Sequence, residues 1–430
     1  MSRFQWLQHR PRSVGSGDIR GVNPSAVTPS ASGGGSAGPG ERRSAQRVAL
    51  CVAVDWYFCL HWLPLAEALR EEGFDVAVIT EVTDAGCAAR IRTAGLRLLP
   101  MRLSRKGLNP LVELRSVATL WRLLRRERPD LFHAIAQKPV LYGTLAARLA
   151  GVRAIVGTLA GMGFVFTSAA LKARVLRPLV TAAYRLLLGA EHVRIIVQNP
   201  EDAQQLRHEA GIAPVLIRGA GVDLSRFRPA PEPPPPVTVI LASRMLWDKG
   251  VQEFVDAARL LAARGIGARL VLVGKPDTGN PSAVPVERLR AWQAEGVVEW
   301  WGHRDDMPAT LADAHIVCLP SYREGLPTIL IEAAAAGLPL VASDVPGCRE
   351  VVRHGSNGLL VPARDSVRLA DALASLIEDA ALRRRYGERS RQLAVSAFGI
   401  DEVASATLAV YRQVLPTTRE NPHPRPGGGA

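Results

Sequence analysis

The chain has 430 residues, of which 47% are hydrophobic and 22% are charged, and its formal net charge is +13. This length is sufficient for two domains with separate cores. Its 5 cysteines are scattered, without the spacing of a metal site or a disulfide framework, which excludes a disulfide-rich secreted scaffold and indicates a reducing compartment such as the cytosol.

Residues 1–46 are rich in Gly, Ser, Pro and Ala and contain no apolar core of signal-peptide length. We expect a disordered N-terminal extension there, or a start that precedes the native one. From Gln46 onward, strand-like apolar runs alternate with amphipathic helix patterns, which predicts an open parallel sheet covered on both faces. The expected strands are 47–54, 75–80, 131–135, 155–156 and 195–198, with a helix over 63–72.

Positive charge is concentrated in residues 101–200, which hold sixteen Lys and Arg against four Asp and Glu. Basic amphipathic helices are predicted over 171–188 and 111–128. An anionic membrane surface fits this pattern better than nucleic acid, because the segment has no zinc-finger or RNA-recognition signature. The alternative is a pair of surface helices whose arginine stems cover apolar area of their own domain.

Residues 154–171 form an uncharged run that reaches the lower limit of a transmembrane helix. Glycines at 157, 161 and 163 instead favour a strand followed by a flexible loop, and we predict no membrane span.

A proline-rich segment over 229–236 can form neither a helix nor a central strand and predicts a domain boundary. The alternation then restarts, so the predicted fold class is α/β, with two Rossmann-like doubly wound domains that face a cleft. The expected elements here are strands 237–242, 269–273, 316–319 and 340–343 and helices 251–264 and 327–336. The expected parts of the chain are an extension (1–46), a first domain (47–228), a linker (229–236), a second domain (237–399), a helix that could cross back to the first domain (400–415) and a disordered tail (416–430).

In such folds, ligands bind at the carboxyl ends of the strands. A dinucleotide requires Gly-x-Gly-x-x-Gly after the first strand, and neither domain has it, because Gly161-Met162-Gly163 is followed by Phe164. Hydride transfer is therefore disfavoured.

Glu324 and Glu332 flank a glycine-containing turn that opens into an alanine-rich helix. A glutamate beside the free N–H groups of a helix start can hold sugar hydroxyls while the N–H groups attract a diphosphate, so the spacing suits a nucleotide-sugar. The alternative is a solvated helix face with a capping charge.

Arg244 and Lys249 lie in a predicted loop between the first strand of the second domain and the following helix. A forked guanidinium and a compact ammonium together suit a diphosphate, on which negative charge grows when a glycosidic bond breaks. The alternative is a solvated loop with surface charges.

These residues resemble retaining glycosyltransferase family four, of the two-domain B-type fold, over nearly all of residues 47–415. The resemblance rests on the E-x7-E element from Glu324 to Glu332, the pair Arg244 and Lys249, the segment Gly219-Ala220-Gly221-Val222-Asp223 with Phe227, and Gly355, Asn357 and Gly358.

The resemblance implies a role for each matching residue. Glu324 would hold the donor sugar, the N–H groups of Gly325 and Leu326 the phosphates, and Glu332 the ribose. Such enzymes retain anomeric configuration without an obvious protein nucleophile, so the leaving phosphate itself would help to deprotonate the acceptor hydroxyl. We expect no cofactor and no metal, since Asp305 and Asp306 have no metal-like set of partners nearby in the sequence.

Within the family, the chain looks like the bacterial branch that builds capsule, exopolysaccharide or O-antigen repeat units on a polyprenyl diphosphate carrier. The segments that carry this likeness are Val54-Asp55-Trp56-Tyr57-Phe58, Gln137-Lys138-Pro139-Val140-Leu141-Tyr142-Gly143, 160–167 and Gln198-Asn199-Pro200-Glu201-Asp202. The expected substrates are a uridine-linked nucleotide-sugar that carries a hexose or N-acetylhexosamine, and a lipid-linked sugar. The expected location is the cytoplasmic face of the membrane.

Three further residues are candidates for the acceptor side. His61 follows the first strand and is either an acceptor contact or a packing residue, and Lys138, in an expected cleft-facing loop, is either an acceptor-phosphate contact or a surface charge. Many relatives have a histidine two positions beyond His133, where this chain has Ile135, so His133 is either an acceptor-side residue or a core or loop histidine.

Two other functions remain open on the same fold. One is a sugar-nucleotide epimerase or donor hydrolase, which would require a second set of acid and base groups in the cleft. The other is a non-catalytic paralogue that binds nucleotide-sugars or membrane, which the presence of Arg244, Lys249, Glu324 and Glu332 disfavours.

Overall fold

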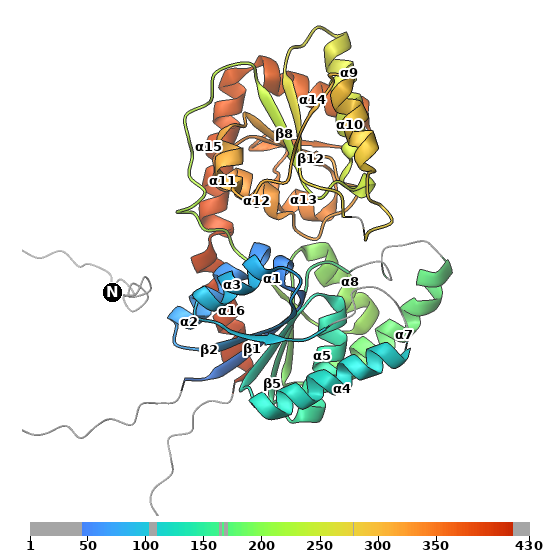
Figure 1. Ribbon diagram of the computed structural model, residues 1–430, viewed down its shortest axis with the longest axis vertical. Coiled ribbons are helices and arrows are strands. Elements are labelled where there is room, and N and C mark those ends of the chain that lie inside the picture. Colours follow the sequence, from blue (N-terminus) through green and yellow to red (C-terminus); the bar gives the residue numbers. More distant parts are fainter. Residues whose placement is uncertain (1–44, 103–109, 163–165, 167–170, 278, 416–430) are drawn as a thin grey trace, which may run out of the picture. The chain divides into compact units, whose positions relative to one another are not determined.

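The computed structural model describes residues 45–102, 110–162, 166, 171–277 and 279–415 (Figure 1). Predictions for residues 1–44 and 416–430, and for 163–165 and 167–170 of the glycine-bearing segment, lie outside the described residues. From Gln46 onward the chain forms one compact unit.

The first domain is built on a seven-stranded sheet in the order β3-β2-β1-β4-β5-β6-β7, in which every strand pair is parallel. Its central strands are runs of buried apolar residues, as expected for a parallel sheet that is covered on both faces. The strands are β1 (Arg47–Val54), β2 (Asp75–Glu81), β3 (Arg97–Pro100), β4 (Leu131–Ile135), β5 (Ala154–Leu159), β6 (Val193–Val197) and β7 (Val215–Leu216).

The second domain contains a six-stranded parallel sheet in the order β10-β9-β8-β11-β12-β13. Its strands are β8 (Thr238–Ala242), β9 (Arg269–Val273), β10 (Glu299–Gly302), β11 (Ile316–Leu319), β12 (Leu340–Ser343) and β13 (Gly358–Val361). The strand order reverses between β1 and β4 in one sheet and between β8 and β11 in the other. Two doubly wound α/β domains are thereby confirmed.

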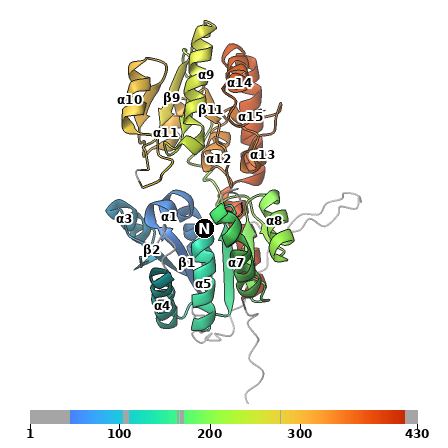
Figure 2. The ribbon, with the colours of Figure 1, turned by 90° about the vertical axis from the view of Figure 1, so that its right-hand side faces the viewer.

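Helices connect the strands in both domains (Figure 2). Those of the first domain are α1 (Asp55–His61), α2 (Leu63–Glu71), α3 (Ala85–Thr93), α4 (Pro110–Glu127), α5 (Gln137–Ala150), α7 (Leu171–Leu188) and α8 (Pro200–Ala210). Those that follow are the 3-10 turn η2 (Trp247–Lys249), α9 (Val251–Ala263), α10 (Val286–Ala294), α11 (Met307–Ala312), α12 (Thr328–Ala335), α13 (Pro346–Val351), α14 (Ser366–Glu378), α15 (Ala380–Ala397) and α16 (Ile400–Val414). Among the described residues, none of these helices has both the length and the apolar character that a membrane crossing requires.

The last helix, α16, completes the core of the first domain. It packs against α2, β5 and β6, and in Figure 1 the red α16 lies beside the blue α2. Tyr411 of α16 is fully buried, and its hydroxyl lies 2.8 Å from Nδ1 of His133 on β4. The other ring nitrogen of His133 lies 2.7 Å from Oγ1 of Thr158 on β5. Helix α16 is therefore hydrogen-bonded to the centre of the first sheet.

We expect Tyr411→Phe to lower the free energy of unfolding by about 1–3 kcal/mol, because it leaves a buried ring nitrogen of His133 without a partner. The measurement is urea-induced unfolding. Tyr386→Phe is a matched control, because Tyr386 is also buried but its hydroxyl makes no hydrogen bond with the described residues. Equal losses in the two variants would contradict the role of the Tyr411 hydroxyl.

Candidate active site

Two loops at the carboxyl ends of β8 and β11 approach each other at the switch point of the second sheet. Gly250 makes this approach possible: its φ is +71°, and a Cβ there would lie 2.1 Å from the carbonyl oxygen of Pro320. Lys249, directly before it, is thereby held beside the loop that carries Glu324.

Lys249 and Glu324 form an ion pair in which Nζ lies 2.5 Å from Oε1. Ser321 donates a hydrogen bond from Oγ to the same carboxylate oxygen at 2.6 Å. The two charged side chains are only 21% and 10% exposed, so solvent screens the pair weakly. Oε2 of Glu324 makes no hydrogen bond with the described residues, which leaves it available to a ligand hydroxyl.

The turn between Glu324 and α12 presents unpaired backbone donors. The N–H groups of Gly325 and Leu326 have no acceptor within the described part of the chain, and Pro327 supplies no side-chain cap to α12. A Cβ at Gly347 would lie 2.4 Å from the carbonyl oxygen of Gly325, so only glycine at 347 lets α13 pack this closely against the turn. Free N–H groups at a helix start form an anion-binding site.

His61, at the end of α1 in the first domain, lies within the electrostatic influence of Lys249 and Arg244. Burial, followed by the positive charges of Lys249 and Arg244, lowers the pKa of His61 to about 4. The His61 ring is therefore neutral at pH 7, and its Nδ1 is hydrogen-bonded to Oγ1 of Thr328 at 2.9 Å. Arg244 is 44% exposed, and its guanidinium forms an ion pair with Asp277 at 2.9 Å. In this conformation its partner is therefore Asp277 and not Glu324.

Glu332 is the fifth residue of α12 and is half-buried. Burial raises its pKa to about 8, and the nearby guanidinium of Arg226 only partly opposes that shift. Its carboxyl group makes no hydrogen bond with the described residues. A protonated carboxyl can both donate to and accept from a pair of ligand hydroxyls.

The other two acceptor-side candidates lie elsewhere. His133 is a core histidine: it is fully buried, both ring nitrogens are bonded, and burial lowers its pKa to about 3. Lys138 does not lie in a loop as expected but in the first turn of α5, where its Nζ lies 2.7 Å from Oε1 of Glu113. A phosphate that bound Lys138 would therefore compete with the Glu113 carboxylate for the same ammonium group.

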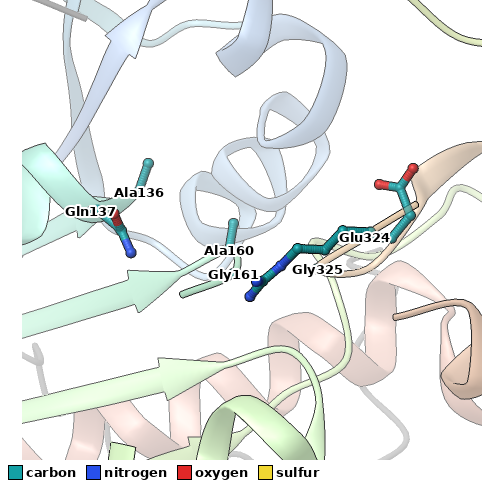
Figure 3. A pocket seen from close by; sticks show the side chains of 7 residues that line it. Ala136, Gln137, Ala160, Gly161, Glu324 and Gly325 are labelled. Atoms are coloured by element: carbon teal, nitrogen blue, oxygen red, sulfur yellow. The ribbon is translucent and has the colours of Figure 1, made fainter. Parts of the chain in front are cut away.

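A pocket of about 300 Å³ lies where the two domains meet (Figure 3). Ala136 and Gln137 follow β4, Ala160 and Gly161 follow β5, and the opposite wall is formed by 323–325. In Figure 3 the Glu324 carboxylate points away from Ala136 and Gln137, toward its own domain. The pocket therefore joins strand ends of the first domain to the turn of the second.

Sequence reasoning missed several contributors. Ser321, Gly347 and the partner of His61, Thr328, have no signal of their own in the sequence, because each acts through a contact formed by the fold. Asn199, which donates to the carbonyl oxygen of Gly325, was noted only within a family-like segment. In the described ranges, no group of three or more His, Cys, Asp and Glu is placed to hold a metal ion.

Two family models match the chain. One described as "Glycosyl transferase 4-like" matches residues 47–199, and one described as "Glycosyl transferases group 1" matches residues 236–379, so together they cover more than half of the chain.

Two curated relatives match over most of their length. The N,N'-diacetylbacillosaminyl-diphospho-undecaprenol alpha-1,3-N-acetylgalactosaminyltransferase of Campylobacter jejuni is 29% identical over 375 residues, covering 82% of this chain and 95% of that protein. The UDP-Gal:alpha-D-GlcNAc-diphosphoundecaprenol alpha-1,3-galactosyltransferase of Escherichia coli is 26% identical over 352 residues, covering 78% and 88%. The crystal structure of Anabaena HepE in complex with UDP has the same fold, with a TM-score of 0.68 at 20% identity over 85% of this chain and 99% of that chain.

Glu332→Gln tests the protonation of this carboxyl group. Because its folded pKa is raised above the unfolded value near 4.5, wild-type stability should fall as the pH rises from about 4.5 to 8, and Glu332→Gln should lack that loss. By pH 9 we expect the wild-type melting temperature to drop by at least about 2 °C relative to the variant. Glu378→Gln, at an exposed position on α14, should follow the wild type. Parallel curves for wild type and Glu332→Gln would show that Glu332 ionises normally.

Proposed function

Because the chain belongs to the retaining glycosyltransferases of family four, we propose that it transfers a hexose or N-acetylhexosamine from a uridine-linked nucleotide-sugar to a sugar on a polyprenyl diphosphate. The step would serve the synthesis of a capsule, exopolysaccharide or O-antigen repeat unit. The observation that supports this most is that the Lys249–Glu324 pair lies beside the N–H groups of Gly325 and Leu326, which have no acceptor among the described residues.

The donor would lie across this turn. Its diphosphate would accept from the N–H groups of Gly325 and Leu326, and a sugar hydroxyl would bind Oε2 of Glu324. Lys249 already neutralises Glu324, so it could face a phosphate without leaving the carboxylate. Glu332, with a carboxyl that both donates and accepts, would bind the two ribose hydroxyls.

Chemistry would consist of one substitution at the anomeric carbon with retention. The bond from this carbon to the phosphate oxygen breaks, the acceptor hydroxyl oxygen bonds to the same face, and the acceptor proton passes to the leaving phosphate. Negative charge grows on the nucleoside diphosphate, and Lys249, Arg244 and the N–H groups stabilise it. We propose that transfer requires no metal and no cofactor, since these groups supply the positive charge.

The proposed acceptor is supported by the relatives. The Campylobacter and Escherichia coli enzymes are named for acceptors on diphospho-undecaprenol, and the chain spans most of both. The proposed uridine rests on the Escherichia coli donor name, UDP-Gal, and on the UDP in the Anabaena structure. His61, at the junction of the domains, is our candidate for an acceptor-side contact.

An anionic membrane surface is the proposed partner of the first domain, at the cytoplasmic face of the membrane. Helices α4 and α7 both pack against α5, and Figure 2 shows the three helices on one side of the first sheet. They expose large aliphatic side chains, namely Leu111, Leu114, Val175, Leu179 and Leu186. Exposed arginines on the same helices are Arg115, Arg122, Arg125, Arg126, Arg174 and Arg185. Protruding aliphatic groups among cations suit a surface of anionic lipid, which a lipid-linked acceptor would also occupy.

Transfer can be tested directly. Purified protein is incubated with UDP-glucose, UDP-galactose and their N-acetylhexosamine counterparts, together with a short-chain polyprenyl diphosphate-sugar, with and without EDTA. We expect mass spectrometry to show an acceptor heavier by one sugar with one of the donors, and EDTA to leave the rate unchanged. An unmodified acceptor with an epimerised donor would indicate an epimerase, and an unchanged donor would indicate a binding protein.

Glu324→Ala is the matched variant for this assay. We expect turnover to fall by about 10²–10³-fold, because the variant removes both a donor-sugar contact and the partner of Lys249. The variant should remain folded, although leaving the shielded Lys249 charge without its partner is expected to lower its unfolding midpoint. Glu295→Ala, which removes a glutamate paired with Arg259 at the end of α10, should keep full activity. Full activity in Glu324→Ala would remove this residue from the mechanism.

Membrane binding is tested by flotation with phospholipid vesicles. We expect the protein to float with vesicles that contain phosphatidylglycerol but not with neutral ones, and less as salt increases. Leu114→Glu combined with Leu179→Glu should reduce the bound fraction about tenfold, because two exposed aliphatic anchors become anionic. Val367→Glu, at an exposed position on α14 of the second domain, is the control. Equal flotation with both vesicle types would exclude the proposed surface.

A further inference from the structure

Asn199, at the start of α8 in the first domain, reaches across to the turn of the second domain. It is fully buried, and its Nδ2 donates to the carbonyl oxygen of Gly325 at 2.9 Å. The same nitrogen donates to Oδ2 of Asp202 at 2.9 Å. The amide thus uses both of its N–H groups, one inside its own domain and one on the turn beside Glu324.

The orientation of this amide is fixed by chemistry. Its Oδ1 accepts from the backbone N–H of Asp202 at 2.8 Å, which is also the N-cap bond of α8. A backbone N–H can only donate, so the oxygen of Asn199 must face it. The NH₂ group must then face Oδ2 of Asp202 and the carbonyl oxygen of Gly325, which both accept hydrogen bonds from it. A flipped amide would lose all three hydrogen bonds.

The bond to Gly325 also orients a second group. The carbonyl of Gly325 and the N–H of Leu326 belong to one planar trans peptide unit, so they point in opposite directions. By holding the carbonyl, Asn199 turns the N–H of Leu326 away from the first domain. We propose that Asn199 is a positioning residue for the donor diphosphate, which it controls through the Gly325–Leu326 peptide rather than by touching the donor. This inference rests on the proposed function.

The packing around the turn supports this role. A Cβ on Gly325 would lie 2.7 Å from the carbonyl oxygen of Ala160, so the first domain contacts the turn at a second point. A Cβ on Gly347 would lie 2.4 Å from the same Gly325 oxygen, so α13 closes the other side. Nδ2 of Asn199 is the one hydrogen-bond donor to that oxygen among the described residues.

A consequence for binding follows from the position of Asn199 on the other domain. Contact between the domains orients a phosphate-binding N–H and so strengthens donor binding. Because the coupling of two binding equilibria is reciprocal, donor binding must strengthen the contact between the domains by the same free energy. The donor site is therefore complete only when the two domains meet at the Asn199–Gly325 hydrogen bond.

Asn199→Ser separates this role from helix capping. Serine is also a good N-cap, so α8 keeps its cap, but its side chain is too short to reach Gly325. We expect the Kd for UDP, measured by calorimetry, to rise about tenfold, as for loss of one hydrogen bond to a charged group. The Kd for uridine, measured by ligand-observed NMR, should not change, because uridine has no phosphate. Asp365→Ala, which removes the N-cap of α14, is the control and should leave both constants unchanged.

The outcomes distinguish the two levels of proposal. Wild-type protein that binds none of UDP, ADP and GDP would overturn the proposed function, and this inference with it. Wild-type binding of UDP with an unchanged Kd in Asn199→Ser would overturn the positioning role alone. Equal losses for UDP and uridine would also overturn it, because that pattern reports general damage to the site.

Discussion

The close approach of the loops after β8 and β11 is the constraint on which the site depends. It exists because Gly250 has no Cβ to meet the carbonyl of Pro320. This contact places Lys249 beside Glu324. Lys249 in turn neutralises the Glu324 carboxylate near the N-terminus of α12. The same principle recurs at Gly347 and Gly325, where missing side chains let three backbone segments meet. The site is thus formed largely by backbone proximity.

The charged groups around this turn have distinct environments. Glu324 is a shielded ion-pair partner, whereas Glu332 is a half-buried carboxyl whose protonated form is favoured at neutral pH. His61 is kept neutral by burial and by two nearby cations. Negative charge in this part of the second domain is therefore reduced, because Glu324 is neutralised by Lys249 and the raised pKa of Glu332 favours its protonated form, and this limits electrostatic repulsion of an incoming diphosphate.

Much of the fold could be predicted from the sequence, because buried parallel strands appear as apolar runs; β1, β4, β9, β11 and β12 lie where expected. Strand β7 was missed because it has only two residues, and β10 because none of its four residues is fully buried, so neither forms a buried apolar run. Glu324, Glu332 and Lys249 could be named as candidates because each stands in a short local motif, and the structure brings Lys249 and Glu324 together. The Asn199–Gly325 bond could not, because it joins residues 126 positions apart. The loop expected around Lys138 was wrong, because β4 leads directly into α5 and its first residues are polar.

Helix α16 has a consequence for how the chain is made. The first domain begins at the N-terminal side of the sequence, yet its core contains Val403, Leu408 and Tyr411. Synthesis proceeds from the N-terminus, so the ribosome translates almost all of the second domain before it reaches these residues. The order of completion is therefore the reverse of the order of appearance: the domain that emerges first from the ribosome is finished last. Until then it exposes apolar surface on one side of its sheet, and a chain that stops early would retain that surface permanently.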